Sequence, residues 1–212
     1  KASVNQQRFL TDFERTRPEE AVFSDRFYAG LVTNLIYDTR DQVAMPGSGV
    51  FWKTALTYQK EVTGLDADFA KLNTEFRFYL KPLTPGIVIA NRLGGGLVLG
   101  SPTFFQRMQL GGVGNLRGFH TNRFTGKSMV FYNLDLRIKL FSFTSYIVPG
   151  SVGLIAFNDV GRVWEPGETS DQWHDGYGGG LYVVPAELLL IQAAVGFSRE
   201  GALPYISIGF NF

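Results

Sequence analysis

Strict alternation of apolar and polar residues, repeated along most of the chain, is the feature that most constrains the fold. Residues 128–140 alternate between an apolar face (Val130, Tyr132, Leu134, Leu136, Ile138, Leu140) and a second face (Met129, Phe131, Asn133, Asp135, Arg137, Lys139). Residues 69–80 and 204–212 alternate in the same way. Because successive side chains of a strand point to opposite faces, the pattern predicts strands with one apolar and one polar face.

Six further segments read as strands: 27–37, 50–60, 87–99, 152–163, 176–184 and 188–198. Most are separated by turns that contain proline, glycine or both, such as Pro46-Gly47 and Pro149-Gly150. The exception is the glycine-rich connection 101–127, and a connection of that length is usually functional or disordered. The triplets Gly94–Gly96 and Gly178–Gly180 interrupt two strands; we expect them to allow barrel curvature, the alternative being a weak seam.

Two architectures fit these strands. A soluble β-sandwich would bury the apolar faces in a core, whereas a transmembrane β-barrel would turn them to lipid and the polar faces to a wet lumen. Charges at consecutive same-face positions favour the barrel, as in Asp135, Arg137 and Lys139. Aromatic residues near strand ends also favour it, because they predict interfacial girdles: Trp52, Tyr58, Tyr132 and Tyr205.

The composition of the chain argues against several classes of function. The net charge is +1, which gives no support to nucleic-acid binding. The chain has no cysteine and only two histidines, His120 and His174, too few for a zinc site. No nucleophile elbow is present, so we expect no enzyme and no cofactor. No run approaches the roughly 18 apolar residues of a spanning helix.

The first 26 residues differ from the rest. They are polar and charged with a helical tendency, and we read them as a linker or periplasmic segment in which 4–13 could supply an extra strand. They do not begin with a secretory signal peptide, so for an exported protein we expect a mature or trimmed form.

An arginine and an aspartate suggest how the long connection is held. Arg117 lies among glycines in 111–119, and Asp159 lies on one face of the strand 152–163. An arginine on a loop and an acid on a strand wall predict a plug clamped inside a barrel. A guanidinium can fork between two carboxylates, which lysine cannot do with the same geometry.

Several motifs resemble those of the outer-membrane assembly and transport superfamily, of which BamA, TamA and FhaC are members. Leu116-Arg117-Gly118-Phe119 resembles its signature loop, and Phe157-x-Asp159-x-Gly161 its inward-facing strand motif. The segment 37–41 with Pro46-x-x-Gly49 resembles a periplasmic turn, in which we single out Asp38, Arg40 and Asp41. The stretch 205–212 resembles the terminal assembly signal, carried by Tyr205, Ile208, Gly209, Phe210 and Phe212.

The resemblance implies an all-β antiparallel barrel over 27–212, with the loop 101–127 inserted in the lumen. It also implies that Arg117 pairs with Asp159 and with Asp135, supported by Gly118, Phe119, Phe157 and Gly161. Nine strands are visible, or ten with 4–13, fewer than the large family members have, and single-chain bacterial barrels use even numbers. We therefore expect either a short member that forms a homodimer or a C-terminal part of a longer barrel.

The function implied is insertion or translocation of protein at the outer membrane of a Gram-negative bacterium or a derived organelle. The expected partners are the lipid bilayer, the barrel assembly machinery and a polypeptide client. The alternative is a passive pore, or a structural membrane anchor for a fused or associated partner.

Overall fold

The computed structural model describes residues 27–62, 68–82, 84–144, 148–169 and 171–209. Within them lie eleven strands and one short 3-10 helix. The nine long strands are β1 (Tyr28–Asp38), β2 (Val50–Glu61), β3 (Phe69–Leu80), β4 (Ile87–Gly100), β7 (Ser128–Phe143), β8 (Gly150–Trp164), β9 (His174–Pro185), β10 (Leu190–Ser198) and β11 (Gly201–Gly209). The predicted strands are therefore confirmed, with small shifts at their ends.

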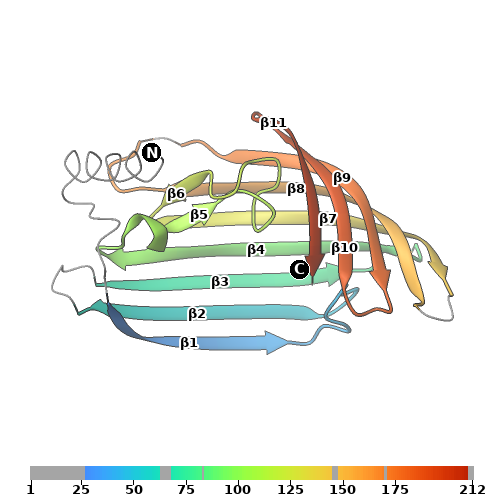
Figure 1. The fold of residues 1–212 in the computed structure, drawn as a ribbon, viewed down its shortest axis with the longest axis horizontal. Helices are drawn as coiled ribbons and strands as arrows, with labels where there is room; N and C mark the ends of the chain where they lie inside the picture. The colour runs from blue at the N-terminus through green and yellow to red at the C-terminus, as the bar shows by residue number, and fades with distance from the viewer. Residues whose placement is uncertain (1–26, 63–67, 83, 145–147, 170, 210–212) are drawn as a thin grey trace, which may run out of the picture.

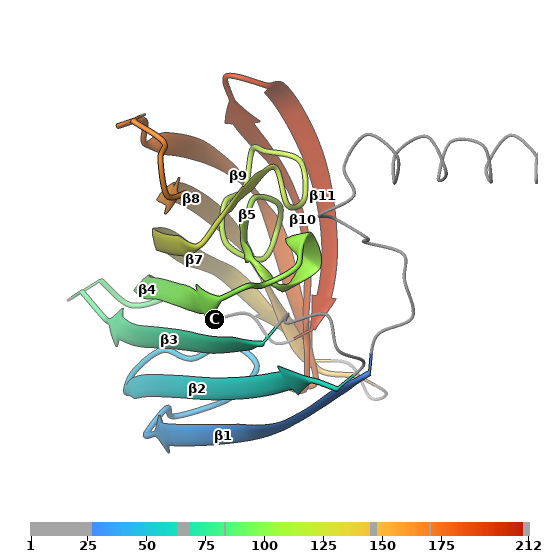
Figure 2. The same cartoon turned by 90° about the vertical axis from the view of Figure 1, so that its left-hand side faces the viewer.

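These nine strands form one antiparallel sheet in the order β1-β2-β3-β4-β7-β8-β9-β10-β11. The sheet curves strongly, so that β10 and β11 turn back over the concave side (Figure 1). The view from the side shows an open half-cylinder rather than a closed ring (Figure 2). The fold is thus the expected antiparallel barrel in partial form, with β1 and β11 as the two ends of the sheet.

Burial in this sheet is inverted relative to a soluble protein. On β7 most of the buried side chains are polar, and both Asn133 and Asp135 are almost fully enclosed, while Leu136 between Asp135 and Arg137 is 38% exposed. The apolar face of β8 is likewise exposed at Leu154. The soluble β-sandwich considered from the sequence is wrong, because no second sheet covers this apolar surface among the described strands.

The connection 101–127 has more structure than its sequence predicted. It contains the 3-10 helix η1 (Phe104–Gln106) and a small hairpin of β5 (Met108–Leu110) and β6 (Phe124–Gly126). This hairpin and the loop between its strands lie inside the concave face of the sheet (Figure 2). The sequence did not predict β5 and β6, because such short strands contain too few residues to show an alternating pattern.

One predicted aromatic position is wrong. Trp52, Tyr58 and Tyr132 lie on the outward face as expected, but Tyr205 points inward, where its hydroxyl meets the loop. Tyr205 shares the inward parity of Ser207, so the period of β11 itself requires this orientation. No helix in the described part of the chain is long and apolar enough to cross a membrane. The predictions for residues 1–26, including the extra strand at 4–13, lie outside the described residues.

Candidate functional site: the loop and the inner wall

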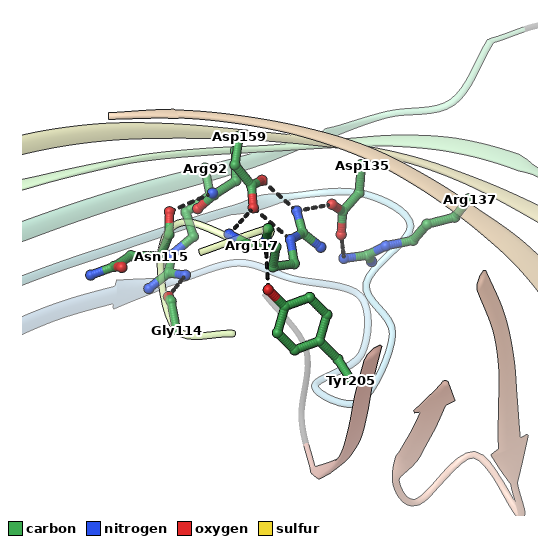
Figure 3. Close-up of polar contacts among 10 residues, drawn as sticks. Arg92, Gly114, Asn115, Arg117, Asp135, Arg137, Asp159 and Tyr205 are labelled. Atoms are coloured by element: carbon green, nitrogen blue, oxygen red, sulfur yellow. Dashed lines mark hydrogen bonds and ion pairs between the residues drawn. The ribbon is translucent and has the colours of Figure 1, made fainter. Parts of the chain in front are cut away.

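Arg117 lies at the centre of a buried polar cluster on the inner wall (Figure 3). Its side chain donates to Asp159 through Nε at 2.7 Å and through Nη2 at 2.6 Å, and Nη2 also reaches Asp135 Oδ1 at 2.7 Å. The backbone N–H of Arg117 adds a further bond to Asp159 Oδ2 at 2.8 Å. Arg117 is 5% exposed and both acids are fully buried, so the fork between two carboxylates expected from the sequence is the observed geometry.

The charges of this cluster are balanced. Asp135 also faces Arg137, whose Nη2 lies 3.6 Å from Asp135 Oδ2, so two arginines meet two aspartates. Arginine is not deprotonated in proteins, so the guanidinium stays charged at every physiological pH and both contacts are ion pairs.

The motif Phe157-x-Asp159-x-Gly161 presents three inward positions of β8 to the loop. The ring of Phe157 lies beneath the guanidinium of Arg117, with its centroid 3.9 Å from Cζ, as in a cation–π contact. Gly161 leaves room for Leu110 of β5, because a Cβ there would lie 2.9 Å from a methyl carbon of Leu110. Each of the three residues has a separate contact that explains its type.

An apolar cluster holds the loop next to the polar one. Phe119 is 1% exposed and packs in a cluster with Leu110, Leu116 and Phe131. Its ring also meets Phe124 edge to face, with centroids 5.3 Å apart. Because Leu116 and Phe119 flank Arg117 and Gly118, the loop is fixed by packing on both sides of the ion pairs.

The loop is also bound on the side of β3, β4 and β7. Arg92 of β4 donates to the carbonyl of Gly114 at 2.6 Å and to Glu75 of β3 at 2.7 Å. Asn133 of β7 donates to the carbonyl of Asn115 at 2.9 Å. These contacts bring the loop backbone onto the wall over several strands, and local sequence pattern did not indicate them.

A glycine of β9 makes the close approach of the loop possible. A Cβ at Gly176 would overlap the carbonyl oxygen of Arg117. At Gly178, two residues further on, a Cβ would lie 2.6 Å from the ring of Phe157. Gly178 was expected from the sequence to relieve crowding, whereas Gly176 was missed, since a glycine in a strand has many structural reasons.

The residues predicted as a terminal assembly signal lie on β11 or beyond it. Tyr205 accepts a hydrogen bond from the N–H of Gly118 at 2.6 Å, so this strand contacts the loop directly. Ile208 points outward and is 70% exposed, and Gly209 ends the strand. Phe210 and Phe212 lie outside the described residues. Their predicted role in assembly stays a prediction.

The predicted periplasmic turn is a compact structure between β1 and β2. Asp38 accepts from Arg40 through Nε at 2.9 Å and Nη2 at 2.7 Å. Asp41 accepts from the N–H groups of Gly47 and Ser48 at 2.9 and 3.2 Å and pairs with Lys81 at 3.2 Å. Desolvation raises the pKa of Asp41, but these hydrogen bonds outweigh it and hold that pKa below its usual value.

This turn reaches across to the far strands of the sheet. Met45 packs against a cluster of Ile155, Tyr182, Val184 and Leu190 on β8, β9 and β10. Arg137 donates to the carbonyl of Pro46 at 3.5 Å, which links the turn to the cluster around Arg117 through Asp135. The predicted turn residues Asp38, Arg40 and Asp41 thus lie together in one turn. Arg137 connects this turn to the cluster around Arg117.

The ion pairs, hydrogen bonds and packed rings of this site fix the loop 101–127 against the inner wall of the sheet. No group of three or more His, Asp or Glu residues suited to a metal ion occurs in the described part of the chain. A curved antiparallel sheet with an apolar outside, a polar inside and an inserted loop defines an outer-membrane type of β-barrel wall.

Comparison with known proteins identifies the family. The Omp85 superfamily domain matches residues 4–212, so the chain belongs to the Omp85 superfamily, whose members are proteins of the bacterial outer membrane. It is 32% identical over 113 residues to the outer membrane protein assembly factor BamA of Nitratidesulfovibrio vulgaris (strain Hildenborough). This match covers 46% of the chain and 14% of that protein.

A solved structure has the same fold. The crystal structure of BamA from Haemophilus ducreyi lacking POTRA domains 1–3 matches with a TM-score of 0.64 at 18% identity, covering 85% of this chain and 42% of that one. The chain thus spans less than half of either protein. The expectation that it corresponds to a C-terminal part of a longer barrel agrees with these findings.

Proposed function

We propose that this chain forms the loop-bearing part of an outer-membrane barrel that inserts or translocates polypeptide. Its membership of the Omp85 superfamily and its similarity to an outer membrane protein assembly factor support this function. The loop 101–127, held by Arg117, controls the interior of the barrel. The work needs no cofactor and no catalytic residue.

The fork of Arg117 between Asp159 and Asp135 carries this proposal. Burying these charges costs free energy, and a buried ion pair is often no more stable than an apolar replacement of the same volume. The fork gives the loop one defined position. The N–H donors of the Arg117 guanidinium, five in number, lie in a rigid plane and fit only one arrangement of the two acids. A loop with one defined position acts as a latch.

Replacing Arg117 tests the latch. Arg117→Ala and Arg117→Lys are both expected to unplug the loop, because neither side chain forks between two carboxylates. The protein is reconstituted in planar bilayers and vesicles, and ion conductance and insertion of a client barrel are measured. Both variants should raise conductance and change insertion. Lysine behaving like arginine would refute the forked geometry as the cause.

Arg162→Ala is the matched control. Arg162 also pairs with an aspartate, Asp171 at 2.9 Å, but Asp171 is almost fully exposed and this pair shares no residue with the cluster around Arg117. Exposed pairs contribute little, so this variant should conduct and insert like the unmodified protein. An equal effect of both arginine variants would mean that general loss of charge, and not the latch, is being measured.

The second candidate is a passive pore or a structural anchor for a fused or associated partner. The inward packing of Phe119 and Leu116 favours it, because a loop so well packed can serve stability alone. An anchor predicts that Arg117→Ala lowers the free energy of unfolding while conductance and insertion stay constant.

The partners follow from the same proposal. The apolar outer face fits a lipid bilayer, and the expected protein partners are the barrel assembly machinery and a polypeptide client. Because the described sheet is open, we also propose a homodimer. Native mass in detergent separates these cases, since a dimer has twice the mass of one chain.

A further inference from the structure

The loop is held from a second side, by the hairpin of β10 and β11. The N–H of Gly118 donates to the hydroxyl of Tyr205 at 2.6 Å, and the hydroxyl of Ser198 donates to the carbonyl of Gly118 at 2.5 Å. The hairpin of β10 and β11 therefore binds both the backbone N–H and the carbonyl group of Gly118. Gly118 is the neighbour of Arg117, so the two sets of contacts are one residue apart in the chain.

The approach of the loop to β10 is as close as a backbone permits. Gly118 has a φ of +93°, and a Cβ there would lie 2.7 Å from the carbonyl oxygen of Phe197. A Cβ at Gly196 would lie 2.8 Å from the nitrogen of Gly118. Glycine at both positions lets the two backbones touch, which makes the hydroxyl of Tyr205 reachable.

The turn of the hairpin adds contacts further along the loop. Glu200 accepts from the N–H of His120 at 3.3 Å and pairs with Arg123. The guanidinium of Arg199 lies 5.6 Å from the ring centroid of Phe124. The hairpin thus follows the loop from Gly118 to Phe124.

The strand β11 lies at an edge of the described sheet, as β1 does. It pairs only with β10 among the described strands, and Ile206 and Ile208 on its outward face are 80% and 70% exposed. Tyr205 is the inward residue in the middle of β11. Its hydroxyl accepts from the N–H of Gly118 and donates to the carbonyl of Phe119 at 3.5 Å, and these bonds join the centre of the strand to the loop.

We propose that the loop is a tie with two anchors, Arg117 on β7 and β8 and Tyr205 on β11, so that release of Arg117 also frees the terminal strand. Tyr205 is a positioning residue: it acts through the loop and touches no client. This inference rests on the proposed function only in calling the loop a latch. It predicts that opening of the interior and loosening of β11 occur together.

Hydrogen exchange on the folded protein in detergent tests the tie, with a double-variant cycle. Tyr205→Phe removes the hydroxyl and keeps the ring, so exchange at Gly118 and along β11 should rise roughly 3- to 10-fold, since the lost bond to Gly118 is short and the lost bond to Phe119 is long. Arg117→Ala should raise exchange along β11 as well, although Arg117 does not touch that strand. In the Arg117→Ala background, Tyr205→Phe should then change β11 by less than about 2-fold, because groups that act as one unit are not additive.

Tyr132→Phe is the matched control. It removes a hydroxyl that donates to Asn91 at 2.7 Å on the outward face, opposite to the face that contacts the loop, and should leave exchange on β11 unchanged. Should Arg117→Ala prevent folding, Arg117→Lys replaces it in the cycle. Equal effects of Tyr205→Phe in both backgrounds, or a fully protected β11 in the Arg117 variant, would overturn the tie.

The outcome is separable from that of the proposed function, because exchange is measured without client and without current. A rise in β11 exchange with unchanged conductance and insertion would keep the tie and refute the proposed function. Changed conductance with β11 still protected would keep the proposed function and refute the tie.

Discussion

Asp159 accepts three hydrogen bonds from Arg117, one from the backbone N–H and two from the guanidinium. Asp135 accepts one, from Nη2. The loop is therefore bound through its backbone as well as its charge, and the two acids hold it unequally.

This inequality predicts different costs for the two acids. Asp159→Asn should lower the free energy of unfolding by about 3–5 kcal/mol, since it breaks a buried pair at its main acceptor. Asp135→Asn should cost less, because Asp159 keeps all three bonds to Arg117. Urea unfolding followed by tryptophan fluorescence measures both. Equal costs would show that the charge balance of the cluster, and not the number of bonds, sets its stability.

The close contact at Gly176 predicts that an uncharged change also displaces the loop. Gly176→Ala places a methyl group where the carbonyl of Arg117 lies and should cost about 1–3 kcal/mol through overpacking. Cleavage of the loop by an added protease should become faster. Gly114→Ala, in the same loop with open space around its Cβ position, should leave cleavage unchanged. Slow cleavage in the Gly176 variant would mean that the wall shifts instead of the loop.

The depressed pKa of Asp41 predicts a pH-dependent turn. Its folded pKa lies below the unfolded value near 3.8, so its stabilisation is fully present above that value and is lost as the pH falls through the folded pKa. Protection factors of the Gly47 and Ser48 amides, corrected for intrinsic exchange, should be constant at neutral pH and fall below about pH 4. Asp41→Asn should show the low protection already at pH 7. The same pH profile in that variant and the unmodified protein would assign the transition to another group.

The inverted burial predicts where a new charge is tolerated. Leu136→Lys puts a charge in the middle of the outward face of β7 and should cost about 2–4 kcal/mol in a bilayer. Ala55→Lys, in the middle of β2 but facing a polar inner cavity with Asn73 and Glu75, should cost little. Folding yield into lipid vesicles, read from heat-modified gel mobility, measures both. A greater loss for the Ala55 variant would contradict the assignment of the two faces.

The sequence by itself determined the strands, the two faces of the sheet and the residues of the main ion pairs. Alternation is a local property, so residues 128–140 alone assign Leu136 outward and Asp135 inward once a membrane is the solvent. The motif around Asp159 and the glycine-flanked Arg117 likewise lie in short segments, and this is why their pairing could be expected.

Only the tertiary structure decided how the loop meets the rest of the sheet. The bonds of Gly118 to Tyr205 and of Pro46 to Arg137 join residues more than 80 positions apart, and the overlap of Gly176 with Arg117 depends on how far the sheet curves. No local period encodes a distance across a curved sheet. Such contacts arise from the curvature and register of many strands together, and that is why the tie to β11 appears in the fold and not in the sequence.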